Sequence, residues 1–406
     1  MERLILQSDW DEVLKYAYFE TSEKEEKAWV SYKQGVQQSI HGSLWNQGVS
    51  TSGVPYVTGS DGFTVQEVTK RSITVSYTDD SVNLYRKFVA PSTSFKSIHS
   101  ERKSVVSLDV TGGGLGVSAD SEGKLRLWQT DTGEVRRELV GHCADVYTCQ
   151  FFPSGIVVLS GGADMQLKIW SAETGKCAAT LIGHRGAIND TAIVDRGRNV
   201  VSCGRDGAVR LWDVGQQQCL GTFQEIGGEV NSCCLGDVSA TLSLEAGDQA
   251  TSDREVGTEG KLLVLGCENS TVQGYGLQNR KKVFEFPTHG PVNTCAFLSE
   301  VTAVCGTQDG HITVLDLRNI RVPLQEWKDS RSAILCFCPY KGGFFTGTGD
   351  GSCFYVDSQF HARVELTGSD CDPVYAVKCD GSDVYTACRD SRIRKYSLAV
   401  CGESLV

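Results

Sequence analysis

The sequence predicts an all-β protein, a seven-bladed β-propeller that follows a small, mostly-β N-terminal domain. Three observations support this fold class. Tryptophans recur 42 residues apart, at Trp128, Trp170 and Trp212. Each repeat contains four short strand-like runs separated by turn residues, which is the content of one propeller blade. No part of a repeat shows the apolar spacing of a helix over the length that a helix needs.

Residues 1–90 lie outside the repeats and are predicted to form the small N-terminal domain. From Leu44 to Tyr77, apolar and polar residues alternate between glycine turns, a pattern typical of strands. The charged stretch TSEKEEKAWV, at residues 21–30, comes before this pattern and favours a short helix. No function is visible in this part of the sequence.

The propeller is predicted to span residues 91–406, and the second repeat shows its blade pattern most clearly. Four strand-like runs, DVYTCQFF, IVVLSGG, QLKIWS and CAATLIGH, follow one another with a turn signal between each pair. In the later repeats other residues take the place of the tryptophan, namely Tyr275, Leu315, Val356 and Tyr396. Seven units result.

Two parts of the propeller depart from the regular period. The interval from Trp212 to Tyr275 is half as long again as the others, and the excess contains the polar, acidic segment 236–260, which we interpret as an inserted loop. Only ten residues follow Tyr396, too few for a turn and a complete outer strand. We therefore predict that residues 92–99 close the last blade and remove its open edge.

Two short motifs mark the repeats. Gly-His occurs at 141–142 and 183–184, and Leu-Trp-Asp occurs at 211–213. Through these motifs the chain from about residue 93 onward resembles the WD-repeat family. The resemblance implies that the seven units form a closed seven-bladed propeller of WD repeats.

Serine, histidine and aspartate, the residue types of a hydrolytic triad, recur together in two repeats. The two sets are His142, Ser160, Asp164 and Trp170, and His184, Ser202, Asp206 and Trp212. A catalytic site has no reason to recur at one period. The family resemblance implies instead a structural chain of hydrogen bonds from aspartate through histidine and serine to the indole N–H. Such buried polar groups are tolerated when each has a partner, so we expect no enzymatic activity.

Other repeats hold incomplete sets. The first has Ser118 and Trp128, with Glu122 at the position where aspartate is expected. The fourth has Leu265 and Asn269, the sixth Thr346 and Asp350, and the seventh Thr386 and Asp390. We expect the fourth blade to be the least rigid.

The inter-blade loops, which join the outer strand of one blade to the inner strand of the next, open on one face of a propeller. Five of the seven carry acidic residues, which are Glu101, Asp145, Glu229, Asp329, Asp370 and Asp372. Arg185, in the third loop, and Arg205 interrupt this pattern. We hypothesise that these residues bind a partner and that the acids steer a surface rich in lysine and arginine. The alternative is that they are simply solvated.

Composition narrows the classes of partner and cofactor. The formal net charge of −11 argues against nucleic acid, since binding phosphates needs clustered lysine and arginine. The first residues are too short an apolar run for a signal peptide, and no run of about 18 apolar residues occurs, so we expect no membrane contact. Seventeen cysteines without disulfide-like spacing indicate reduced thiols and a cytoplasmic or nuclear protein.

Four of these cysteines fall at one equivalent place in the first strand of a blade: Cys149, Cys233, Cys295 and Cys336. Equivalent places are spread around the ring of a propeller, so these thiols are not expected to converge on one metal ion. We interpret them as small buried apolar residues and expect no metal and no cofactor.

Four blocks of sequence give a closer resemblance. These are FFPSGIVVLSGGADMQLKIWSAE at 151–173, TAIVDRGRNVVS at 191–202, SDREVGTEGKLL at 252–263 and LTGSDCDPVY at 366–375. With the N-terminal domain, they resemble the family of proteasomal ATPase-associated factors. This resemblance implies a non-enzymatic chaperone for assembly of the proteasome regulatory particle.

The same resemblance implies the partner and its mode of action. The chaperone would bind the C-terminal domain of a proteasomal ATPase subunit, restrain its association with the proteolytic core, and be a monomer outside that complex. The alternative is another WD-repeat adaptor, which recruits substrates to a ubiquitin ligase or binds ubiquitin. The residues do not indicate which ATPase subunit is bound.

Overall fold

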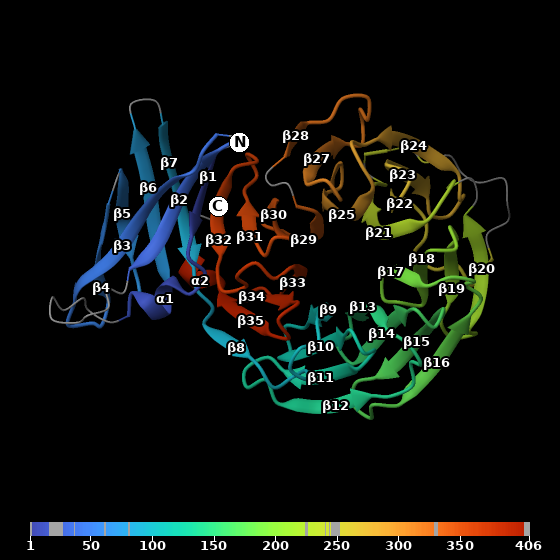
Figure 1. The fold of residues 1–406 in the computed structure, drawn as a ribbon. Coiled ribbons are helices and arrows are strands. Elements are labelled where there is room, and N and C mark those ends of the chain that lie inside the picture. Colours follow the sequence, from blue (N-terminus) through green and yellow to red (C-terminus); the bar gives the residue numbers. More distant parts are fainter. Residues whose placement is uncertain are drawn as a thin grey trace.

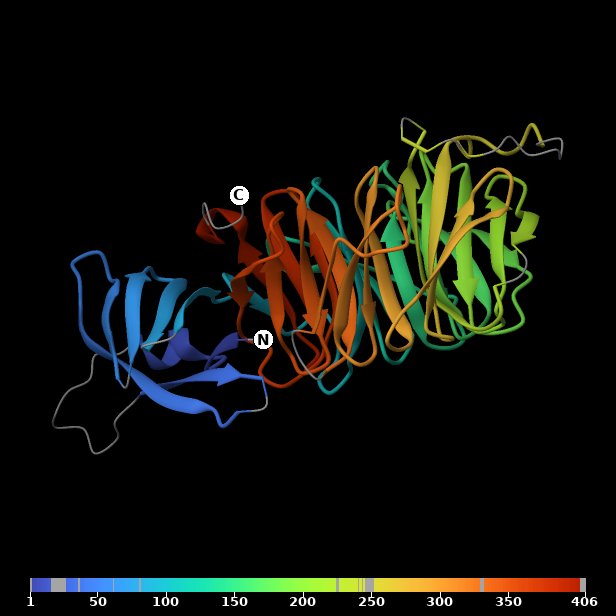
Figure 2. The ribbon, with the colours of Figure 1, turned by 90° about the horizontal axis from the view of Figure 1, so that it is seen from above.

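The computed structural model is a ring of seven β-sheet blades with an N-terminal β domain beside it (Figure 1). Seen from above, the N-terminal domain projects from one edge of the disc (Figure 2). The predicted all-β propeller fold is confirmed. The structure describes residues 2–15, 27–35, 37–60, 62–79, 82–223, 226–239, 241–242, 244, 252–328 and 332–401.

Each of the first five blades is an antiparallel sheet of four consecutive strands, because glycine and aspartate turns separate short runs rich in β-branched residues. Blade 1 contains β9 (Val105–Val110), β10 (Leu115–Asp120), β11 (Leu125–Gln129) and β12 (Val135–Leu139). Blade 2 contains β13 (Val146–Phe151), β14 (Val157–Gly162), β15 (Gln166–Ser171) and β16 (Cys177–Ile182). Blade 3 contains β17 (Ile188–Val194), β18 (Asn199–Gly204), β19 (Val209–Asp213) and β20 (Gln218–Phe223).

Blades 4 and 5 keep this order without the tryptophan. Blade 4 contains β21 (Val230–Asp237), β22 (Lys261–Cys267), β23 (Thr271–Gly276) and β24 (Lys282–Pro287). Blade 5 contains β25 (Val292–Ser299), β26 (Thr302–Thr307), β27 (His311–Asp316) and β28 (Gln325–Lys328). Tyr275 and Leu315, each 1% exposed, fill the place of the tryptophan.

The sheet of blade 6 continues into the N-terminal domain. Its own strands are β29 (Ile334–Tyr340), β30 (Gly343–Thr348), β31 (Cys353–Val356) and β32 (Ala362–Leu366). β32 pairs in parallel with β7 (Val82–Val89), and β6 (Ser72–Asp79) and β5 (Phe63–Val68) follow in the same sheet. One seven-stranded sheet therefore crosses the domain boundary that the sequence places at residue 90.

Blade 7 takes its outer strand from the other end of the ring. It contains β33 (Val374–Cys379), β34 (Asp383–Cys388) and β35 (Ile393–Ser397), and its fourth strand is β8 (Thr93–Phe95). Phe95 lies opposite Ile393 in the antiparallel pairing, and its ring lies 5.6 Å from that of Trp128 in blade 1. After β35 the chain turns into the short helix α2 (Leu398–Cys401).

The rest of the N-terminal domain is a second sheet of four strands. It contains β1 (Glu2–Leu6), β2 (Ala28–Gln34), β3 (Ile40–Val49) and β4 (Pro55–Gly59), with helix α1 (Trp10–Val13) after β1. Ala28 and Val30 are fully buried in the core between the two sheets. The helix predicted over 21–30 is therefore wrong for residues 28–30, which form a strand because alternate side chains enter this core, and residues 21–26 lie outside the described residues.

Asparagine side chains join the inner strands of neighbouring blades around the axis. The Nδ2 of Asn189 in blade 3 donates to the Val230 carbonyl of blade 4 over 2.9 Å. Asn231 and Asn293 make the same contact with the next blade, to the carbonyls of Val292 (3.1 Å) and Ile334 (3.0 Å). An asparagine at the equivalent position of three inner strands thus fixes three consecutive blade junctions.

The segment predicted as an inserted loop, 236–260, connects β21 and β22, although its first two residues belong to β21. Its described end folds back on blade 3, where Asn199 Oδ1 accepts from the backbone N–H of Val256 over 2.7 Å. Arg254 donates to Gln218 Oε1 over 2.8 Å. Within the described ranges, the chain has no helix long and apolar enough to cross a membrane.

Candidate functional site

Blades 2 and 3 contain hydrogen-bonded chains that run from aspartate to tryptophan. In blade 3, His184 Nδ1 lies 3.0 Å from both Asp206 oxygens, and His184 Nε2 lies 2.7 Å from Ser202 Oγ. Trp212 Nε1 donates to the same serine oxygen over 2.8 Å. In blade 2 the corresponding distances are 2.8, 2.7 and 2.8 Å, among Asp164, His142, Ser160 and Trp170.

These chains brace the blades and do not present a nucleophile to solvent. The side chains of Ser160 and Ser202 are fully buried, and each hydroxyl already contacts both a histidine and an indole. Burial lowers the pKa of His184 although Asp206 opposes this shift, so the imidazole stays neutral at pH 7. A serine nucleophile must lie within reach of its substrate, and these two do not.

Blade 1 contains a third complete chain, and here the interpretation from the sequence was wrong. His99 contacts Asp120 Oδ2 at 3.0 Å and Ser118 Oγ at 2.7 Å, and Trp128 donates to Ser118 over 3.1 Å. Glu122, expected in place of the aspartate, instead forms an ion pair with Lys103 near the surface. The carboxylate comes from the end of β10, two residues earlier, and the His99 imidazole reaches it there.

Blades 5 and 6 replace the chain with a local threonine–aspartate contact. Thr307 donates to Asp309 and Thr348 donates to Asp350, each over 2.5 Å. Thr346, which the sequence pattern pairs with Asp350, donates instead to the Cys336 carbonyl over 3.1 Å. The threonine of this contact lies two residues later than the spacing of blades 2 and 3 predicts.

Blades 4 and 7 are held in other ways. In blade 7, Asp390 accepts two hydrogen bonds from the guanidinium of Arg394, whose side chain is only 2% exposed. In blade 7 an arginine contacts the aspartate, as a histidine does in blades 1 to 3. In blade 4, Leu265 is fully buried, and hydrogen bonds run along β23 instead, from Tyr275 to Gln273, from Gln273 to Thr271 and from Thr271 to Asn269.

The inter-blade loops and the hairpins between second and third strands lie together on one face of the disc. In every blade a backbone N–H of this hairpin donates to a carbonyl of the loop; the donors are Ser121, Ala163, Arg205, Glu268, Gln308, Gly349 and Arg389. The acceptors are Ser104, Asp145, Ala187, Glu229, Pro291, Ala333 and Pro373. We call this surface the loop face. Its backbone is fixed by the sheets, so its side chains are presented in a defined pattern.

Seven of the eight residues predicted to bind a partner lie in the described part of the loop face. Exposed among them are Glu101, Arg185, Arg205, Glu229 and Asp370. Asp145 and Asp372 are half-buried. Asp329 lies outside the described residues.

Arg389 and Tyr147, which the sequence did not single out, lie among these acids. Arg389 Nε donates to Asp372 Oδ1 over 2.8 Å, so the charge of this acid is partly compensated. The Arg205 guanidinium stacks on the ring of Tyr147, 5.6 Å from its centroid. The loop face is therefore mixed in charge, with exposed carboxylates at Glu101, Glu229 and Asp370.

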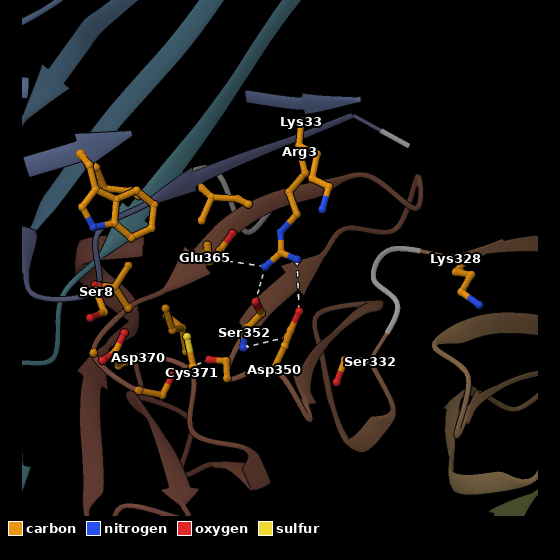
Figure 3. A pocket seen from close by; sticks show the side chains of 18 of the residues that line it. Arg3, Ser8, Lys33, Lys328, Ser332, Asp350, Ser352, Glu365, Asp370 and Cys371 are labelled. Atoms are coloured by element: carbon orange, nitrogen blue, oxygen red, sulfur yellow. Dashed lines mark hydrogen bonds and ion pairs between the residues drawn. The ribbon is translucent and has the colours of Figure 1, made fainter. Parts of the chain in front are cut away.

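A pocket of about 1020 Å³ lies where the N-terminal domain meets the loop face of blade 6 (Figure 3). Arg3 crosses this junction, forming ion pairs with Asp350 at 3.5 Å and Glu365 at 3.8 Å. Glu365 also pairs with Arg86 at 2.8 Å. Asp370 of the loop face lines the pocket, so the two domains share one surface here.

The cysteines are reduced in the structure, and all seventeen are free thiols. Thiols of neighbouring blades approach each other in pairs, as Cys234 and Cys295 do at 3.6 Å between the sulfurs. Burial raises the pKa of the Cys149 thiol to about 12, so it is not a reactive thiolate. The described residues contain no group of three or more histidine, cysteine or acidic side chains placed to hold a metal ion.

Comparison with known proteins identifies the family of this chain. The sequence model described as "WD domain, G-beta repeat" matches residues 133–171 and 175–213. Proteasomal ATPase-associated factor 1 of Gallus gallus is 48% identical over 396 residues, covering 97% of this chain and 98% of the relative. The Homo sapiens protein of that name is 47% identical, covering 98% of each chain. Probable proteasomal ATPase-associated factor 1 of Dictyostelium discoideum is 34% identical, covering 97% and 95%.

Proposed function

The chain belongs to the proteasomal ATPase-associated factor 1 family, and from this premise we propose that it binds an ATPase subunit of the proteasome regulatory particle. We propose further that it is a non-enzymatic assembly chaperone, which binds the C-terminal domain of that subunit and restrains its association with the proteolytic core. The observation that carries the proposal is the similarity to these relatives over 97–98% of the chain, which includes both domains.

The loop face supports this role as the binding surface. It gathers the exposed carboxylates Glu101, Glu229 and Asp370 on a rigid backbone, as electrostatic steering of a basic partner surface requires. The cations Arg185 and Arg205 interrupt the acids and would fix the orientation of the partner, because a wrongly turned partner would meet like charges. A disc seated on the ATPase would keep the proteolytic core away by its bulk.

The test is direct binding of each proteasomal ATPase C-terminal domain, produced separately, to the full chain by isothermal titration calorimetry. We expect at least one domain to bind and the double variant Glu101→Lys, Glu229→Lys to weaken that binding about tenfold or more, with a smaller loss at high salt. The matched control is Glu173→Lys, which reverses an exposed acid on the opposite face of blade 2.

Two results would separate the parts of this proposal. If none of the domains binds while isolated ubiquitin or a ubiquitin-ligase adaptor does, the chain is an adaptor of another kind. If a domain binds and the double variant has the affinity of the control, the ATPase remains the partner and the acidic residues of the loop face do not steer it.

A further inference from the structure

The sheet β1–β4 turns one face to the core and the other outward, toward the pocket at blade 6. Strand pairing fixes which residues share the outward face, because side chains alternate along each strand. Ser31 and His41 pair across β2 and β3, with 2.7 Å between Ser31 Oγ and His41 Nδ1, while Leu4 and Val30 point to the core. The outward positions are Arg3, Ile5, Trp29, Ser31, Lys33, His41, Ser43, Trp45, Tyr56 and Thr58.

Large aromatic side chains on this outward face are open to solvent. Trp29 is 48% exposed and Tyr56 is 61% exposed, whereas Trp128, Trp170 and Trp212 of the blades are buried. Trp45 lies between them on β3, with the Lys27 ammonium 5.7 Å from its ring centroid. Tryptophan and tyrosine in such positions are the residues that most often dominate the affinity of a protein interface.

The charge of this outward face is one-sided. Its ten positions include Arg3 and Lys33, and none of them is aspartate or glutamate. Arg3 is held by Asp350 and Glu365 across the domain junction, while Lys33 is exposed on β2. The opposite wall of the pocket adds Lys328, which is exposed and forms an ion pair with Asp309 at 3.5 Å. The same opening is therefore bordered by cations and the Trp29 ring, and also by the acids Asp350, Glu365 and Asp370.

The pocket connects the outward face to the loop face without a break. Ile5, Trp29 and Lys33 line it from the N-terminal sheet, and Asp370 and Cys371 line it from the loop between blades 6 and 7. The ion pairs of Arg3 and the pairing of β32 with β7 hold the two walls in place before any partner arrives. A preformed pocket costs a partner little ordering of this chain on binding.

We propose that this outward face and its pocket bind an acidic segment of the partner ATPase domain, with a large apolar side chain of that segment seated against Trp29 and Ile5. An acidic residue of the segment pairs with Lys33. This inference rests on the proposed function and adds a second contact to it. The loop face attracts basic groups and the N-terminal sheet attracts acidic ones, so two contacts of opposite sign fix one orientation of the partner.

A single-stranded nucleic acid is the other class of ligand that stacks on aromatic sheets and pairs with lysine. The composition of the pocket disfavours it. Asp350, Glu365 and Asp370 all line the pocket and would repel a phosphate chain that entered it. A protein segment avoids this repulsion because its negative charges are spaced along a neutral backbone.

The test compares two variants of the full chain, Trp29→Ala and Lys33→Glu, in calorimetric titrations with each separately produced ATPase C-terminal domain. Both side chains are solvent-exposed, so circular dichroism and thermal unfolding should match the wild type. We expect Trp29→Ala to weaken binding about tenfold or more and Lys33→Glu about threefold or more, the latter loss shrinking at high salt. The matched controls are Val283→Ser and Lys176→Glu, which change an exposed apolar residue and an exposed lysine far from the pocket.

Each outcome decides the question. If a domain binds the wild type and the two variants bind it as tightly as the controls do, the inference is overturned and the proposed function stands. If no domain binds the wild type, both fail. A fluorescent decauridylate is titrated in parallel, and tight binding that Trp29→Ala abolishes would mean that the sheet is a nucleic-acid platform instead.

Discussion

In blades 1 to 3 a histidine from the inter-blade loop reaches a buried tryptophan through one serine, whereas blades 4 to 7 have no such chain in their described residues. Two of the blades without it meet segments from outside the regular repeat. Blade 6 pairs with β7 and blade 7 receives β8, whereas the described end of the insertion in blade 4 folds back on blade 3. The contrast teaches that a blade can be held from within by a polar chain or from its edge by added chain.

The largest expected effect separates the two acids of blade 1. Asp120→Ala removes a fully buried carboxylate that contacts His99 and accepts from the backbone N–H groups of Glu122 and Lys124. We expect the free energy of unfolding to fall by about 3 kcal/mol, because buried groups lose their partners. Glu122→Ala breaks only a surface ion pair and should cost less than about 0.5 kcal/mol. Denaturant unfolding of both variants measures the difference. Equal losses of stability would contradict the assignment of Asp120, rather than Glu122, as the stabilising carboxylate of blade 1.

A smaller effect compares one place in blades 3 and 6. Ser202→Ala leaves His184 and Trp212 without their shared buried partner, and we expect a loss of about 2 kcal/mol. Thr346→Ala removes a single hydrogen bond to a backbone carbonyl and should cost about 1 kcal/mol or less. The same denaturant experiment measures both. A Thr346→Ala loss as large as that of Ser202→Ala would show that blade 6 depends on this hydroxyl as blade 3 depends on its serine.

The smallest effect concerns pH. Burial lowers the pKa of His142 and of His184 from the ordinary value of 6.5, so the unfolded chain binds these protons at a higher pH than the folded chain does. The stability that the two neutral histidines provide is complete above pH 6.5 and decreases as the pH falls through their lowered pKa values.

Hydrogen exchange read blade by blade can detect this. After correction for the intrinsic exchange rate, protection in blades 2 and 3 should fall between pH 7.5 and pH 5.5 more than protection in blades 6 and 7. In His184→Gln, which cannot take up the proton, blade 3 should lose this extra dependence while blade 2 keeps it. A uniform fall over all four blades would contradict the assignment.

The sequence predicted the propeller and the two regular chains because their signals are local and repeated. His142 and His184 precede their serines by the same interval, and both serines precede their tryptophans by ten residues. Blade 1 escaped because His99 precedes Ser118 by one residue more than this interval, and its aspartate follows that serine by two residues instead of four. A sequence pattern that allows each spacing to differ by one or two residues would have matched His99, Ser118 and Asp120.

Other features had no local signal at all. The pairing of Val364 with Lys87 joins strands from opposite ends of the chain, and the sequence of neither strand indicates which strand it pairs with. The pocket and the outward face of the N-terminal sheet follow from that pairing, so Trp29 and Lys33 could not be assigned a role from the sequence. The charge of the loop face was overestimated in the same way, because the pairing of Arg389 with Asp372 depends on the path of two loops.

The strands that complete the ring also set an order on its synthesis. β8 is made long before β35, and β7 is made long before β32, because six complete blades separate the first pair in the sequence and five separate the second. On a ribosome these early strands must wait with unpaired edges until the final blades emerge, and such distant pairings are the slow part of folding. A chain cut short before blade 7 has no closed ring, because the pairing of Phe95 with Ile393 can form only after blade 7 has been made.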